Sequence, residues 1–314
     1  MATRFPQVVA FGGGHGLAAS LGALRLITED LTAVVTVADN GGSSGRLRSD
    51  FGVLPPGDLR MALSALCDDT EWGHAWAEVM QHRFTGEGGL AGHPLGNLLI
   101  ISLWQLHDDP VRGLDLVGRL LGARGRVLPM SAVPLDLEAR VRGADPSAPE
   151  EERVVRGQVE IAGTEGSVES ISVLPENPPV RSEVLHAVAD ADWIVLGPGS
   201  WYTSVLIHLL VEDLREALLV TKARRLLTLN LEMSTTETSG FSAVKHLATL
   251  RATVPGLRLD AVLADPSVVD DRIGLERACG DLGAELIVQP VSRPGRAGEH
   301  DTLRLAAAYR DILQ

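Results

Sequence analysis

The 314-residue sequence has little of what marks secreted, membrane or nucleic-acid-binding proteins. Its only two cysteines, Cys67 and Cys279, lie far apart without metal-site spacing, so we expect two free core thiols in a reducing compartment. No apolar run reaches about 18 residues and residues 1–7 carry no secretory pattern, so we expect a cytoplasmic protein without membrane contact. Acidic residues outnumber basic ones by 41 to 28, and the net charge of −13 argues against sequence-independent binding to nucleic acid.

What is present is typical of an ordinary globular protein. Hydrophobic residues make up 45% of the chain and charged residues 22%, which provides enough apolar surface for a complete core. We expect residues 1–314 to form a single α/β domain, because strand-like and helix-like patterns alternate along most of the sequence. We also expect a homo-oligomer, although no pattern in the sequence specifies one.

A glycine-rich turn follows the first apolar run of the chain. The buried-strand pattern of residues 8–11 ends in four glycines within five positions, and residues 17–26 continue at helical spacing. Such a turn directs backbone N–H groups and a helix N-terminus at one point, which favours an anion such as phosphate. Leu17 stands where the dinucleotide fingerprint needs its third glycine, and there is no P-loop lysine, so neither NAD nor ATP is favoured. The simpler alternative is a turn that only lets the helix pack on a sheet.

Two further strand ends carry polar or glycine-rich segments. The β-branched run at residues 33–38 ends at Asp39, where doubly wound folds place a residue that reaches the ribose of a nucleotide. The run at residues 193–196 ends in Gly197, Gly199 and Ser200, which repeats the logic of the first turn. Because parallel strands share one carboxyl edge, we expect these segments to meet around a single phosphate-binding hollow.

The pattern changes between residues 127 and 175. Alternating apolar and polar residues at 135–141 and 154–161 predict antiparallel strands joined by a polar hairpin at 145–152. We therefore expect 127–175 to be a β-rich antiparallel insertion in the α/β frame. Parallel strands resume at 226–231, 259–265 and 286–289, and a final helix spans 302–313 with Asp301 as its cap.

Taken together, the motifs resemble those of the YvcK-type gluconeogenesis factors, within a superfamily that includes the 2-phospho-L-lactate transferases. The matching blocks follow one another along almost the whole chain, at residues 12–16, 37–48, 55–60, 93–98, 197–204 and 300–301. The resemblance implies a Rossmann-like parallel sheet flanked by helices. It also implies binding of a UDP-sugar, UDP-N-acetylglucosamine in particular, and a role in gluconeogenic growth and cell-shape control.

The sequence departs from the family pattern at two places. The usual Asp-Asp-Gly-Gly is here Asp39-Asn40-Gly41-Gly42, which removes one carboxylate and makes the loop a poorer Mg²⁺ ligand. The later Thr-Gln-Pro-Gly-Glu-Thr block keeps Glu237 and Thr238 but lacks the Gln-Pro-Gly. The first departure weakens the expectation of a metal-dependent reaction at the first loop. The second weakens the expectation of ligand contacts at the later loop.

Our leading hypothesis is a cytoplasmic regulatory protein whose ligand is a nucleotide sugar resembling UDP-N-acetylglucosamine. Amides of the first glycine turn would hold the diphosphate, the second turn would close the site, and polar side chains would bind ribose or sugar hydroxyls. The candidate ligand-binding residues are Gly12, Gly13, Gly14, His15, Gly16, Asp39, Asn40, Gly42, Ser43, Ser44, Asn97, Gly197, Gly199, Ser200, Tyr202, Thr203 and Asn230.

The alternative is an enzyme resembling the 2-phospho-L-lactate transferases, which move a phospho-ester group from a nucleotide-activated donor to a deazaflavin acceptor. Asp39, Asp58 and Glu237 would then be the catalytic or metal-binding candidates, and Mg²⁺ is expected only in this alternative. Asp58 is equally well explained as a helix cap, and His93 is better explained by a structural hydrogen bond. A scaffold that only binds other proteins is the third hypothesis.

Overall fold

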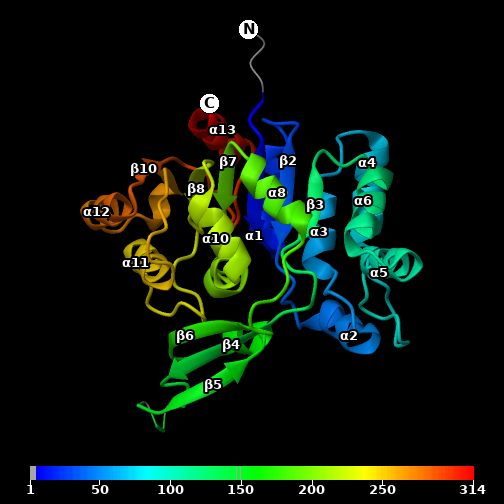
Figure 1. Cartoon of the computed structure of the whole chain (residues 1–314), viewed down its shortest axis with the longest axis horizontal. Coiled ribbons are helices and arrows are strands. Elements are labelled where there is room, and N and C mark those ends of the chain that lie inside the picture. The colour runs from blue at the N-terminus through cyan, green and yellow to red at the C-terminus, as the bar shows by residue number, and fades with distance from the viewer. Residues whose placement is uncertain (1–4, 146, 149) are drawn as a thin grey trace.

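The computed structural model describes residues 5–145, 147–148 and 150–314. Its centre is a seven-stranded sheet in the order β10-β9-β8-β7-β1-β2-β3, in which every neighbouring pair is parallel (Figure 1). The strands are β1 Val8–Gly12, β2 Leu31–Val35, β3 Arg126–Pro129, β7 Trp193–Leu196, β8 Arg224–Thr228, β9 Ala261–Ala264 and β10 Glu285–Val288. The predicted α/β class with a parallel Rossmann-like sheet is confirmed.

The strand order reverses at the centre of this sheet. From β1 the chain first builds outward through β2 and β3, and later from β7 through β8, β9 and β10 on the other side. The neighbours β1 and β7 therefore have connections that leave in opposite directions, which opens a crevice at their carboxyl ends. The apolar residues of β1 and β7 are buried on both faces, which explains their continuous hydrophobic runs.

Helices cover both faces of the parallel sheet. Right-handed crossovers running in opposite directions place their helices on opposite faces, and Figure 1 shows α8 and α10 in front of the sheet. The helices are α1 Gly14–Leu24, α2 Gly42–Phe51, α3 Gly57–Ala65, α4 Glu71–Gln81, α5 Leu95–His107, α6 Pro110–Leu120, α7 Gln158–Gly163, α8 Ser182–Asp190, α9 Ile207–Leu210, α10 Glu212–Val220, α11 Ala243–Thr253, α12 Arg272–Leu282 and α13 Thr302–Leu313. A π-helical turn, η1 Trp201–Leu206, leads directly into α9, and a short 3₁₀ turn, η2, spans Pro266–Val268.

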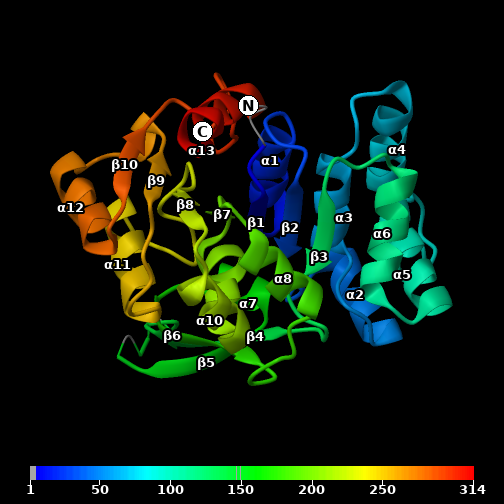
Figure 2. The ribbon, with the colours of Figure 1, turned by 45° about the horizontal axis from the view of Figure 1, so that its top comes forward.

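A small antiparallel sheet of order β5-β4-β6 interrupts the parallel frame, with strands β4 Asp136–Arg142, β5 Glu152–Arg156 and β6 Ser167–Leu174. It lies to one side of the main sheet in both ribbon views (Figures 1 and 2). The predicted insertion is present, but its expected start at residue 127 is wrong, because Val127 pairs with Ala33 as part of the parallel sheet.

The second predicted antiparallel strand is also shorter than expected. Residues 158–161 form the start of α7 because Gly157, at a φ of 101°, turns the chain out of the strand. The alternating apolar and polar residues of this segment therefore belong to a short helix, in which Ile161 is buried.

Buried polar contacts connect the last helix to the sheet. The hydroxyl of Tyr309 on α13 lies 2.9 Å from Ser20 Oγ of α1 and 3.0 Å from Thr228 Oγ1 of β8. Cys67 and Cys279 are both buried and free, as predicted, and burial raises the pKa of each thiol to about 11. Among the described residues, no helix is long and apolar enough to cross a bilayer.

Candidate functional site

The glycine turns that follow β1 and β7 touch one another backbone to backbone. A Cβ atom added to Gly16 would lie 2.3 Å from the carbonyl oxygen of Pro198 and 2.7 Å from Cα of Gly199. Only a residue without a side chain allows this approach. The expectation that the two turns meet is therefore confirmed, and they meet where the strand order reverses.

A hollow of about 460 Å³ opens at the contact between these turns. It combines the first turn and α1 with the second turn, the loop after β8, the insertion and the segment before α13. The lining residues are Gly13, Gly14, His15, Gly16, Ala19, Asp58, Gln158, Gly199, Ser200, Ser204, Asn230, Gly298, Glu299 and His300. The described lining contains no arginine or lysine, so main-chain N–H groups are its principal positive dipoles.

Two carboxylates lie beside the first turn. Asp58, in the first turn of α3, accepts a hydrogen bond from the backbone of Gly14, and its carboxylate lies against Gly13. Burial, and to a lesser degree the nearby charge of Asp39, raise the pKa of Asp58 from 3.8 to about 7. No group of three or more histidine, cysteine, aspartate or glutamate side chains suited to a metal occurs among the described residues.

Two side chains of the hollow carry a buried polar atom without a hydrogen-bond partner in the described structure, Nε2 of His300 and Oε1 of Gln158. His300 donates a hydrogen bond to the backbone of Leu229, and burial lowers its pKa to about 4. Its imidazole is therefore neutral at pH 7, and the unpartnered Nε2 is an acceptor available to a ligand hydroxyl or N–H group.

Comparisons with known proteins identify the family of the chain. Residues 8–280 match the family described as 2-phospho-L-lactate transferase CofD. The chain belongs to this family. The protein named "Putative gluconeogenesis factor" of Mycobacterium leprae is 49% identical over 310 residues, which cover 98% of this chain and 86% of that protein. The gluconeogenesis factor of Listeria innocua is 36% identical over 308 residues, which cover 98% of this chain and 89% of its own.

The solved structures extend this similarity to the fold. A UPF0052 family member from Bacillus halodurans has a TM-score of 0.86 and 32% identity, covering 98% of this chain and 99% of that one. The resemblance to gluconeogenesis factors in the sequence is thereby confirmed over almost the full length.

Several predicted ligand residues of this CofD-family chain form a buried network outside the hollow. Asn97 accepts a hydrogen bond from Nε of Arg60 at 2.9 Å and donates to Oγ of Ser43 at 2.9 Å. Oγ of Ser43 lies 2.8 Å from Nδ1 of His93, which has the structural role favoured for it. Ser44 accepts from the amide of Gly57 at 3.1 Å. These contacts join α2, α3 and α5, and Ser43, Ser44 and Asn97 do not line the hollow.

The Asn40 side chain, which departs from the usual family aspartate, holds the insertion. Its Nδ2 donates to Oε2 of Glu160 at 2.7 Å, and its Oδ1 accepts from the amide of Val159 at 3.1 Å. An aspartate here would place a second carboxylate against Glu160, so the amide matches its partner. Asn40 therefore positions α7, which contributes Gln158 to the hollow, and does not itself line it.

Other predicted ligand residues do not line the hollow. Tyr202 and Thr203 are buried within η1, and Gly12 ends β1 with its backbone paired to β2. Gly197 and Gly42 provide left-handed backbone, at φ values of 72° and 46°, that starts the second turn and α2. Sequence reasoning missed Gln158 and Glu299 entirely, whereas His300 was part of a matching block and could have been included.

Glu237 lies in a separate, smaller cavity of about 10 Å³. The cavity shares Gly199, Ser200 and Asn230 with the hollow, so the two spaces lie on either side of the second turn. Burial raises the pKa of Glu237 to about 7, while the backbone N–H groups of Trp201 and Tyr202 lower it in part.

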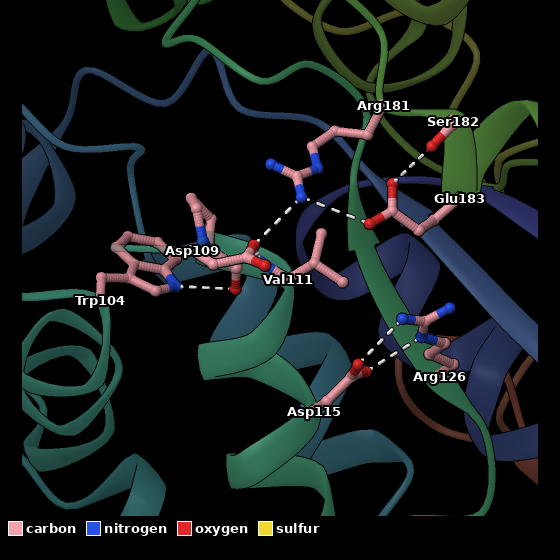
Figure 3. A network of polar contacts seen from close by, with 9 residues as sticks. Trp104, Asp109, Val111, Asp115, Arg126, Arg181, Ser182 and Glu183 are labelled. Carbon is pink, nitrogen blue, oxygen red and sulfur yellow. Dashed lines mark hydrogen bonds and ion pairs between the residues drawn. The ribbon is translucent and has the colours of Figure 1, made fainter. Parts of the chain in front are cut away.

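A larger groove of about 790 Å³ runs beside α6 and β3. Four of its charged side chains, Asp109, Asp115, Arg126 and Glu183, are paired, whereas Arg112 and Arg119 are exposed at its surface. Arg126 forms two hydrogen bonds with Asp115, at 3.0 and 2.9 Å, and Arg181 bridges Asp109 and Glu183 (Figure 3). These contacts connect α6, β3 and the start of α8. The hollow at the glycine turns, where polar atoms lack partners, is the better candidate for a ligand site.

Proposed function

We propose that this protein binds a nucleotide sugar, UDP-N-acetylglucosamine in particular, and acts as a cytoplasmic regulator of gluconeogenic growth and cell shape. The observation that carries the proposal is the contact between two glycine turns at the point where the strand order reverses. In such sheets, this is where nucleotide phosphates bind.

The chemistry of the lining supports a diphosphate ester rather than a free sugar. The first turn leads into α1, whose first N–H groups have no partner within the helix. Ser200 and Gly199 add main-chain donors from the opposite side. Asn230, Gln158 and His300 then offer hydrogen bonds to the ribose, base or sugar at the margin of the hollow.

Isothermal titration with UDP-N-acetylglucosamine tests the proposal. We expect saturable binding of the nucleotide sugar, weaker binding of UMP, and none of free N-acetylglucosamine, because the diphosphate makes the principal contacts. Absence of heat with UDP-N-acetylglucosamine at millimolar concentration would contradict the proposal.

A second candidate function is supported by the carboxylates of Asp39 and Asp58, whose charges interact at the first turn. Hard oxygen ligands of this kind fit Mg²⁺, which supplies neutralisation of phosphate charge in phospho-ester transfer. In this candidate function, Asp39 and Asp58 would hold the ion, since Asn40 is engaged with the insertion.

The corresponding assay supplies a nucleotide-activated phospholactate, Mg²⁺ and the deazaflavin acceptor. Product that forms with the wild-type protein but not with Asp39→Ala would favour the transferase. Absence of product in an assay where a known transferase is active would contradict the transferase and leave nucleotide-sugar binding as the remaining candidate function.

A further inference from the structure

The carboxylate of Glu237 is an unexplained buried charge. The residue is 5% exposed, and neither Oε1 nor Oε2 has a well-formed hydrogen bond within the described structure. Burying a carboxylate in this way is costly unless it is neutralised or serves a purpose. The loop that carries it is held in place by Thr238, whose Oγ1 donates to the carbonyl of Met233 at 2.9 Å.

Glu237 lies next to the second glycine turn, whose Gly199 and Ser200 would also contact a bound phosphate. The backbone N–H groups of Trp201 and Tyr202 point toward its carboxylate, directly after the Gly199 and Ser200 that line the hollow. The helical segment that begins there continues without interruption from η1 into α9. The protein thus places its own anion behind the second turn, with space of about one water molecule around it.

Among the described residues, no lysine or arginine lines the cavity around this carboxylate. The groups that face Glu237 are Tyr202 on η1, His246 on α11 and Glu232 on its own loop. Burial lowers the pKa of His246 and raises that of Tyr202 to about 12, so both are neutral at pH 7. On the other side of the turn, Asp58 and Glu299 add carboxylates to the hollow.

We propose that Glu237 is a proton-linked gate, whose charge must be neutralised by a proton before a diphosphate can contact Gly199 and Ser200. The inference rests on the proposed function, since it concerns the same ligand. An ionised Glu237 repels the phosphate across the turn, whereas the protonated carboxyl does not. Binding of the nucleotide sugar is therefore coupled to uptake of a proton at Glu237.

Titration calorimetry with UDP-N-acetylglucosamine at about pH 6 and about pH 8, in buffers of different ionisation enthalpy, tests this coupling. At the higher pH the wild-type protein should take up a proton on binding. Glu237→Gln should take up about one proton fewer and bind about tenfold more tightly than wild type, with similar affinities at the lower pH. Glu216→Gln, which removes an exposed carboxylate of α10 that lines neither the cavity nor the hollow, should behave like wild type.

The outcomes separate the two proposals. Equal proton uptake by the wild-type protein and Glu237→Gln overturns the role of Glu237 and leaves the ligand site intact. Failure of all three proteins to bind at either pH contradicts the proposed function and the gate with it. If Glu237→Gln does not fold, the wild-type protein is measured by itself. Absence of proton uptake on binding by the wild-type protein then overturns the gate.

Discussion

At the scale of single residues, Asp58 is a residue of the hollow whose buried carboxylate lowers the stability of the folded protein near neutral pH. Its carboxyl has a pKa of about 7 in the folded protein and 3.8 as its ordinary value. A raised folded pKa means that the folded state holds the proton more tightly. Its contribution to stability is therefore complete below about pH 4 and is lost as the pH rises through about 7.

We predict that Asp58→Asn reduces this pH dependence. Between about pH 4.5 and about pH 8, the free energy of unfolding should rise relative to wild type by about 2 kcal/mol, less than the full shift implies because Asp58 is partly exposed. Urea unfolding at the two pH values measures the change. Asp311→Asn, at an exposed carboxylate of α13, should have no such effect, and a similar response from both variants would contradict the prediction.

The sequence was informative about residues whose role depends on local spacing. The positions of Gly13, Gly14, Gly16, Gly199 and Ser200 at the hollow were predictable because a strand followed by a glycine turn has few possible geometries. Asn97 and Ser43 could not be assigned in the same way. Whether such side chains meet a ligand or Arg60 depends on how α2, α3 and α5 pack, which no short pattern specifies.

At the scale of elements, the account depends on close contact between the two turns. We predict that Gly16→Ala separates them, because its Cβ would meet the backbone of Pro198 and Gly199. Overpacking of this kind costs about 1–3 kcal/mol, and the affinity for UDP-N-acetylglucosamine should fall at least about tenfold. Thermal unfolding and calorimetry give the two values.

Gly22→Ala on the same helix is the matched control. A Cβ at Gly22 would be 3.6 Å from Cγ2 of Thr302, which is an ordinary contact, so binding should be retained. Stability should rise slightly, since alanine is the better helix former. Equal loss of affinity in both variants would show that the contact between the turns does not determine the affinity for the nucleotide sugar.

Most of the parallel strands and the last helix were also predictable as elements, whereas β3 was assigned to the insertion. Buried β-branched runs such as β2 and the apolar spacing of α13 specify one structure over enough residues to be distinctive. The short segments around Gly157 were not distinctive. Four residues of alternating polarity, 158–161, fit a strand and a single-faced helix equally well, and the conformation of Gly157 decides between them.

At the scale of the whole molecule, the insertion completes the site from a distance in sequence. Asn40 connects the loop after β2 to α7 through Glu160 and the amide of Val159. We predict that Asn40→Ala loosens residues 152–174 and increases their hydrogen–deuterium exchange, while exchange in β1 and β7 stays unchanged. Affinity for the nucleotide sugar should fall severalfold, because Gln158 is no longer held at the hollow.

Asn40→Asp provides a sharper comparison, since it keeps the shape and places a charge against Glu160. It should loosen the insertion as well, and faster exchange spread evenly over the whole chain in either variant would contradict the proposed connection. Such long-range pairing lay outside what sequence reasoning could reach, because residue 40 lies in the loop after β2 and residue 160 lies on α7, 120 positions later.

A crystal structure with UDP-N-acetylglucosamine tests the central claim most directly. We predict that the diphosphate lies between the two glycine turns, with its oxygens accepting hydrogen bonds from N–H groups of residues 14–16 and of Ser200. A nucleotide sugar bound instead in the groove beside α6 and β3, or at the amino ends of the parallel strands, would contradict the account.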